Sequence, residues 1–154
     1  GARHVVITDV NEKRLAMAEK FGVTRTVNAS QEDLHDVMDE LGMVEGFDVG
    51  LEMSGNENAL DDLINIINHG GKIALLGIYR DSPRVNLNQA IFKGISLKGI
   101  YGREMFETWH KMVAMLGSGL DVSPVITDHI EFEEFETGFQ RLNAGEACKV
   151  VMRL

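Results

Sequence analysis

An aspartate directly follows the first apolar segment of the chain. Residues 4–8 read His-Val-Val-Ile-Thr, a run typical of a buried strand, and Asp9 comes next. In a dinucleotide-binding fold, an acidic residue at the end of the second strand accepts hydrogen bonds from the adenosine ribose hydroxyls, and its charge disfavours the 2′-phosphate of NADP. Asp9 is therefore a candidate ligand for NAD. The alternative is a turn or helix-capping aspartate, which is common between a strand and a helix.

The glycine-rich turn that would support this assignment is not found before Asp9. In a dinucleotide-binding unit this turn lies about 20 residues ahead of the acidic residue. The chain opens Gly-Ala-Arg-His without an initiator Met, so we expect the turn to lie on preceding sequence. An acidic residue in this place also fits a doubly wound methyltransferase, although the polar-aromatic motif usual in that class is not seen in Leu-Glu-Met-Ser-Gly, residues 51–55.

Residues that bind metals or transfer protons are scattered along the chain. The histidines show no ligand spacing, and we expect structural or surface roles for all five: His4, His35, His69, His110 and His129. Cys148 is the single cysteine, which favours a reducing compartment, the cytoplasm. A catalytic zinc needs three protein ligands and an open position. The sequence therefore predicts neither a metal site nor a catalytic residue.

Composition narrows the class of partner. The chain has 154 residues, of which 44% are hydrophobic and 25% charged, and a formal net charge of −9. A surface that binds nucleic acid or anionic lipid must be positive. We therefore expect no nucleic acid and no membrane as partners, and no apolar run is long enough to span a bilayer.

The elements that must position Asp9 alternate between strands and helices. Strands are predicted at residues 4–8, 26–28, 47–53, 72–78, 95–101, 130–132 and 149–154. Helices are predicted at residues 11–21, 58–68, 103–116 and 133–143, with a further one that Ser30 caps and Gly42 ends. Residues 79–90 are expected to be mainly loop. This alternation predicts an α/β fold with a doubly wound parallel sheet.

Four segments resemble a known family over essentially the whole chain. They are GARHVVITDVNEKRL, GFDVGLEMSG, NHGGKIALLGI and IFKGISLKGIYGREMFETW. They are similar to the second half of bacterial L-threonine 3-dehydrogenases, zinc-dependent and NAD-linked members of the medium-chain alcohol dehydrogenase superfamily. The GGKIALLGI type of strand occurs across the superfamily, whereas LEMSG and KGIYGREMFETW are more specific.

The resemblance implies cofactor-binding roles at matching positions. Asp9 would bind the adenosine ribose and Arg14 would lie beside the adenosine. The ends of the fourth and fifth strands would meet the nicotinamide through Leu76, Gly77, Ile78, Ile100 and Tyr101. From residue type alone, Arg14 is equally well a solvated helix-surface arginine, Gly77 a plain strand-end glycine and Tyr101 an aromatic at the rim of a sheet.

The resemblance also implies an incomplete fold. Residues 1–101 would form a partial NAD-binding Rossmann domain that lacks its first strand and glycine-rich turn, and residues 102–154 would complete the catalytic domain. In the strand order 3-2-1-4-5-6 the first strand is central, so its absence leaves unpaired edges. We therefore expect the isolated chain to be unstable, to aggregate or to pair with a complementary segment.

The activity implied is oxidation of the secondary alcohol of L-threonine to 2-amino-3-ketobutyrate by NAD with zinc assistance. The zinc ligands and proton relay of the family lie in its N-terminal domain, so we expect the zinc in the parent protein and this chain alone to be inactive. The family further implies a homo-oligomer, a tetramer. The alternatives are a truncated, non-catalytic nucleotide-binding module and another medium-chain polyol or alcohol dehydrogenase.

Overall fold

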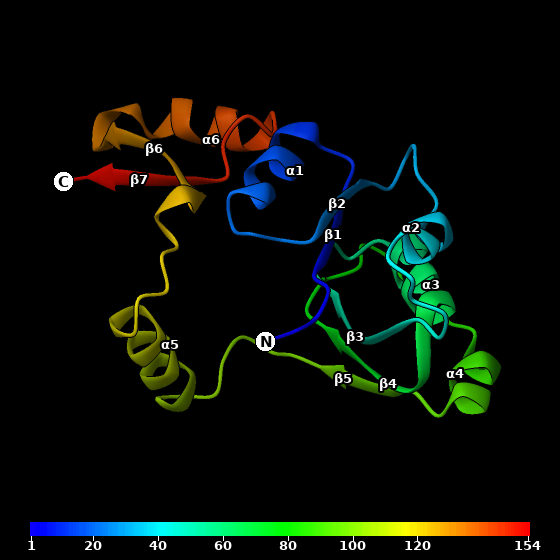
Figure 1. Ribbon diagram of the computed structural model, residues 1–154. Coiled ribbons are helices and arrows are strands. Elements are labelled where there is room, and N and C mark those ends of the chain that lie inside the picture. Colours follow the sequence, from blue (N-terminus) through cyan, green and yellow to red (C-terminus); the bar gives the residue numbers. More distant parts are fainter. The chain divides into compact units, whose positions relative to one another are not determined.

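The computed structural model describes residues 1–154, which form two compact units (Figure 1). The terminal unit comprises Gly1–Glu32 and Trp109–Leu154, and the central unit comprises Asp33–Thr108. Every strand pair in either unit is parallel, which confirms the predicted parallel α/β class. The predicted boundary at residue 101 separates a cofactor-binding domain from a catalytic domain. This division differs from that into compact units, and it stays a prediction.

The N-terminal part of the terminal unit is a strand–helix–strand motif. Its elements are β1 (Val6–Asp9), α1 (Glu12–Glu19) and β2 (Arg25–Asn28). The helix begins at Glu12 because the side chain of Asn11 accepts hydrogen bonds from two backbone amides of the first turn. Leu15 and Ala18 of α1 are buried, as is Val27 of β2. The motif thereby places Asp9 at the carboxyl end of β1.

The C-terminal part of the terminal unit holds a second parallel pair. After α5 (Glu107–Gly117) come a 3-10 turn, β6 (Ile126–Glu131), a second 3-10 turn, α6 (Phe135–Asn143) and β7 (Lys149–Arg153). Figure 1 shows α6 alongside β6 and β7. The helix packs closely because it presents Gly138, where an added Cβ would lie 2.7 Å from Ile130 Cδ1. Asp128 is 8% exposed, and Arg141 neutralises it at 2.5 Å.

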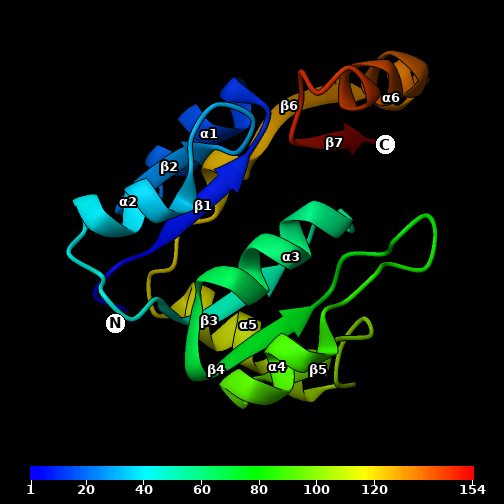
Figure 2. The ribbon, with the colours of Figure 1, turned by 90° about the vertical axis from the view of Figure 1, so that its right-hand side faces the viewer.

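The central unit contains a three-stranded sheet. Its elements in chain order are α2 (Leu34–Glu40), β3 (Phe47–Glu52), α3 (Glu57–Ile66), β4 (Ile67–Leu75), α4 (Leu87–Lys93) and β5 (Ser96–Gly99). The strand order is β3-β4-β5, and Figure 2 shows α3 lying over β3 and β4. Leu60, Ile64, Ile67 and Ile73 form the buried core between the helices and the sheet.

Apolar side chains of β3 and strand edges of the sheets are left without a partner. Val49, Leu51 and Met53, which point away from the α3 side of β3, are 59%, 60% and 60% exposed. β1 is hydrogen-bonded to β2 alone and β3 to β4 alone, so one edge of each is free. No helix combines the length and the apolar character that crossing a lipid bilayer would require.

Several predicted boundaries were wrong. Ser30 does not cap α2, because its hydroxyl donates to Asn28 Oδ1 at 2.6 Å; the cap is Asp33, whose carboxylate accepts from the His35 amide. Within the predicted loop at 79–90, α4 begins at Leu87 after an Asn86 cap. This helix was missed because its seven residues are too few to show a helical period.

The carboxyl ends of two strands also come earlier than predicted. β4 ends at Leu75 rather than Ile78, because the amides of Leu76 and Gly77 both donate to the carbonyl of Glu52 and the regular ladder stops there. β5 ends at Gly99. The candidate residues at 76–78 and 100–101 therefore lie in the segments just after the strands.

Candidate cofactor site

The two oxygens of the Asp9 carboxylate contact different groups of the β1–α1 motif. Oδ1 accepts a hydrogen bond from the Asn11 amide at 2.9 Å, and Oδ2 lies 3.5 Å from Arg14 Nη1. The Asp9 side chain is 25% exposed and that of Arg14 50%. The turn role and the ligand role are thus compatible, since a carboxylate can accept several hydrogen bonds at once.

Hydrogen bonds of the buried Asn28 hold the neighbouring strand end in place. Asn28 pairs with Asp9 in the β1–β2 register and is 6% exposed. Its side chain donates to Glu12 and accepts from the amide and hydroxyl of Ser30. Its own amide donates to Glu32 Oε1 at 3.0 Å. These contacts link α1 to the turn after β2, so the surroundings of Asp9 are preorganised.

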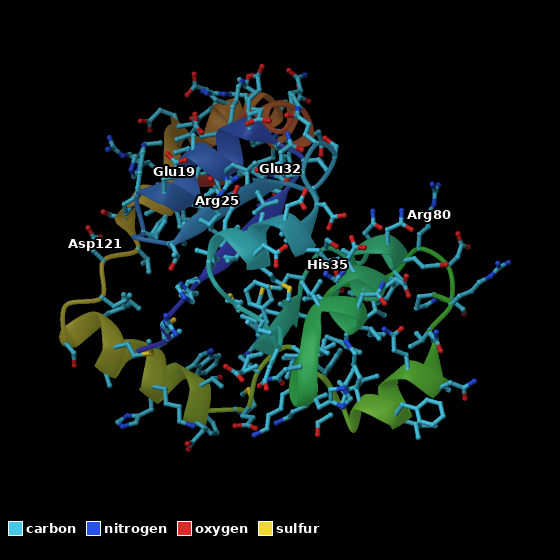
Figure 3. All side chains as sticks on the ribbon, turned by 45° about the vertical axis from the view of Figure 1, so that its right-hand side comes forward. Glu19, Arg25, Glu32, His35, Arg80 and Asp121 are labelled. Carbon is cyan, nitrogen blue, oxygen red and sulfur yellow. The ribbon has the colours of Figure 1, made fainter.

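An ion pair extends this arrangement along β2. Arg25 and Glu32 lie together in Figure 3 and are hydrogen-bonded. The Asn28 amide lowers the pKa of Glu32 against the raising effect of burial, and Arg25 lowers it further. Sequence reasoning did not identify Asn28 or Glu32, although a polar residue ending the second short strand was a visible signal.

In the central unit, the carboxyl ends of β4 and β5 bring the other candidates together. The Ile100 amide donates to the Leu75 carbonyl at 2.8 Å, so the segments after the two strands start side by side. Ile78 and Tyr101 are 93% and 99% exposed, whereas Leu76 and Ile100 are partly covered, at 41% and 38%. This end of the sheet offers backbone, apolar side chains and the exposed phenol of Tyr101.

Gly77 lies where a backbone passes against another backbone. A Cβ at this position would overlap the amide of Gly55 and the carboxylate of Glu52. Gly77 is therefore more than a plain strand-end glycine, because the neighbouring groups leave no room for a side chain at this position. The structure places Asp9 and Arg14 together in the terminal unit, and Leu76, Gly77, Ile78, Ile100 and Tyr101 together in the central unit.

The residues present do not fit a zinc ion. No group of three or more His, Cys, Asp or Glu side chains is placed to hold a metal. Cys148 is exposed, and both ring nitrogens of His4 are buried without a hydrogen-bond partner. A nucleotide fits better, because a partly exposed carboxylate at a strand end suits a ribose diol and a side-chain-free strand end suits close approach of a ring.

Comparison with known proteins relates the chain to dehydrogenases. Residues 1–118 match the family model described as zinc-binding dehydrogenase. The chain is 59% identical over 152 residues to L-threonine 3-dehydrogenase of Chromobacterium violaceum and 60% identical to that of Yersinia pseudotuberculosis. Each alignment covers 99% of this chain and 45% of the relative. The chain thus spans a little under half the length of these curated relatives.

Solved structures show the same fold at low sequence identity. 2R,3R-butanediol dehydrogenase from Bacillus subtilis matches with a TM-score of 0.88 at 21% identity, covering 100% of this chain and 44% of that one. L-idonate 5-dehydrogenase from Escherichia coli matches with a TM-score of 0.85 at 23% identity, over 100% of this chain and 44% of that one. These likenesses confirm the predicted fold class.

Proposed function

Because this chain belongs to the zinc-binding dehydrogenase family, we propose that it supplies the nucleotide-binding part of an NAD-dependent L-threonine 3-dehydrogenase. The observation that carries the proposal is 59–60% identity over 152 residues to proteins of that name. The full protein would oxidise the secondary alcohol of L-threonine to 2-amino-3-ketobutyrate. A hydride leaves the carbinol carbon and the hydroxyl proton is released, so that L-threonine and NAD⁺ give the ketone, NADH and H⁺.

The terminal unit would bind the adenosine end of NAD. The partly exposed carboxylate of Asp9 would accept hydrogen bonds from the ribose hydroxyls. Asn11 and Asn28 keep this carboxylate and the adjoining strand end in position. Arg14 lies beside the same carboxylate and would lie beside the adenosine. A 2′-phosphate would meet the negative charge of Asp9, so NAD is favoured over NADP.

The central unit would meet the nicotinamide end. Gly77 lets the backbone approach the ring, and the segments at Leu76–Ile78 and Ile100–Tyr101 flank it with apolar surface that excludes water. NAD, when bound, supplies the hydride acceptor. These residues bind and orient, and none of them is assigned a proton-transfer step.

The zinc of the family would be held by residues outside the described chain, since the side chains here do not fit the metal. We propose that the full protein is a homo-oligomer, a tetramer, and that the 154 residues alone bind nucleotide without turnover. A non-catalytic nucleotide-binding module is the second candidate, and the lack of a ligand cluster for zinc favours it for this chain taken alone.

The test is NADH formation and NAD binding by the full-length protein. We expect oxidation of L-threonine in preference to 2,3-butanediol, and NAD in preference to NADP. Asp9→Ala should weaken NAD binding at least about tenfold, the value of one lost hydrogen bond to a charged group, and leave zinc content unchanged. The matched control is Asp39→Ala on the exposed surface of α2.

Each outcome separates one part of the proposal. Equal NAD affinity in Asp9→Ala and Asp39→Ala would remove the assigned role of Asp9. Turnover of another alcohol but not of L-threonine would keep the dehydrogenase and replace the substrate. Nucleotide binding with no oxidation of any alcohol by the full-length protein would favour the non-catalytic module.

A further inference from the structure

Glu52 is a buried acid within the LEMSG segment, and the proposed cofactor contacts do not include it. It is the last residue of β3 and is 2% exposed. Side chains alternate along a strand, so Glu52 points to the same face as Gly50, where an added Cβ would lie 2.9 Å from Leu63 of α3. A buried carboxylate is costly unless its oxygens are hydrogen-bonded.

The two oxygens of Glu52 bind two different segments of the central unit. Oε1 accepts from the Ser54 amide at 2.8 Å, the Ser54 hydroxyl at 2.6 Å and the Gly55 amide at 3.0 Å, all in the connection from β3 to α3. Oε2 accepts from the Tyr79 hydroxyl at 2.9 Å, in the segment that follows β4. The carboxylate therefore joins the connections that leave two neighbouring strands.

The backbone of Glu52 makes the same link. Its carbonyl accepts from the amides of Leu76 and Gly77 at 2.8 and 3.1 Å. A Cβ at Gly55 would overlap the Ile78 carbonyl, just as a Cβ at Gly77 would overlap the Gly55 amide. The segments 54–55 and 76–78 are thus in direct backbone contact, and the Glu52 carboxylate fills the space beside them.

The bonding pattern calls for an ionised acid. All the hydrogen bonds to the carboxylate come from N–H and O–H donors, and an ionised carboxylate is purely an acceptor. Burial raises the pKa of Glu52, but the hydrogen bonds from Ser54, Tyr79 and Gly55 outweigh it and bring that pKa below its usual value. The charge is therefore retained at neutral pH.

We propose that Glu52 is a positioning residue that holds the backbone at Leu76–Ile78 in the conformation that receives the nicotinamide ring. The inference rests on the proposed function, which places this backbone at the cofactor. Glu52 itself touches neither ring nor substrate: it acts through Tyr79 and Gly77. Loss of its charge should therefore disturb the nicotinamide end of the cofactor and spare the adenosine end.

The experiment compares two ligands in the full-length protein, NADH and ADP-ribose, the second of which lacks the nicotinamide ring. Glu52→Gln keeps the shape of the side chain and removes the charge. We expect it to weaken NADH binding about tenfold, as for the loss of one charge-assisted contact, and to leave ADP-ribose binding within about twofold. Glu45→Gln, an exposed acid of the same unit, makes the same change in charge and should alter neither affinity.

Equal loss of both ligands, or no loss of NADH affinity, would overturn the inference. If Glu52→Gln does not fold, Tyr79→Phe decides by the same comparison, because it leaves the bonds to Ser54 and Gly55 in place and removes the link to the segment after β4. Failure of the unaltered protein to bind NADH would overturn the proposed function, and this inference with it. Normal NADH binding by the unaltered protein and both variants would overturn the role of Glu52 alone.

Discussion

The substitution Gly77→Ala, which adds one methyl group, tests how tightly the segments after β3 and β4 are packed. The added Cβ would overlap the Gly55 amide, which is backbone and cannot rotate away. We expect Gly77→Ala to lower the free energy of unfolding by about 2 kcal/mol, within the range for overpacked sites.

Gly99→Ala is the matched control for this change. It also lies at the carboxyl end of a strand of the same sheet, yet nothing stands within 4 Å of its added Cβ. Its unfolding free energy should stay within about 0.5 kcal/mol of the unaltered protein. Urea titrations of both variants measure the difference, and equal stability of the two would contradict the close contact at Gly77.

Tyr79 contributes stability to the fold that is lost at alkaline pH. Burial, the hydrogen bond to Glu52 and the charge of Glu52 raise the pKa of Tyr79 from 10.0 to about 12. Because the folded pKa is above the unfolded one, the stability contributed by the neutral phenol is fully present below pH 10 and is lost as the pH rises toward 12. Tyr79→Phe should lack this part of the decline.

The comparison is the unfolding free energy at several pH values from 7 to 12. At pH 7, Tyr79→Phe should be less stable by about 1.5 kcal/mol, the value of a hydrogen bond to a charged group. Tyr101→Phe removes a hydroxyl from a side chain that is 99% exposed, and should follow the unaltered protein throughout. Parallel curves for all three proteins above pH 10 would contradict the assignment.

Between elements, one lysine ties α4 to the end of α3. Lys93 Nζ donates to the carbonyls of Ile64, Asn65 and Ile67 at 2.9, 2.6 and 2.9 Å. The last carbonyls of a helix lack partners within the helix, and a cation there also complements the helix dipole. The short helix α4 is thereby held against the core by a polar contact as well as by the burial of Ala90.

Lys93→Met keeps the length of the aliphatic chain and removes the donors. We expect a loss of about 2 kcal/mol in the free energy of unfolding, since charge-assisted hydrogen bonds to the carbonyls are lost. Lys98→Met, at an exposed position of β5, is the control and should change little. Hydrogen exchange should also speed up in the last turn of α3 in Lys93→Met alone; unchanged exchange there would argue against the cap.

At the scale of the whole molecule, free strand edges and exposed apolar side chains decide whether these 154 residues associate when alone. One edge of β1 and one edge of β3 are free, α5 has no buried residue, and Val49 and Leu51 are more than half exposed. Free edges and contiguous apolar surface recruit other chains. We expect the isolated chain to associate.

Sedimentation velocity over a range of concentrations checks this expectation. The mean sedimentation coefficient should rise with concentration, and Leu51→Lys, which places a charge on the exposed face of β3, should reduce the rise. Glu45→Lys also introduces a lysine in the central unit but lies outside the strands, so it should not. A monomer at all concentrations that unfolds in one cooperative transition would show that these surfaces do not drive association.

Local pattern was sufficient for much of the architecture. The alternation of apolar strand segments with helical periods predicted the parallel α/β class, and a strand followed at once by Asp9 predicted a carboxylate at a strand end. Both depend on residues within one turn or one strand of each other, where hydrophobic period and capping chemistry decide the conformation. The short helix α4 and the helix cap at Asp33 were not predicted, because too few residues carry the pattern that would indicate them.

Tertiary structure alone decided what surrounds the candidate residues. Tyr79 lies 27 positions after Glu52 and Lys93 lies 29 after Ile64, and no local period relates such pairs. Their contacts exist because β3 and β4 are neighbours and α4 returns to the end of α3. A buried charge is stable only where such distant donors converge on it, so the role of Glu52 could be inferred only after the strands had been placed side by side.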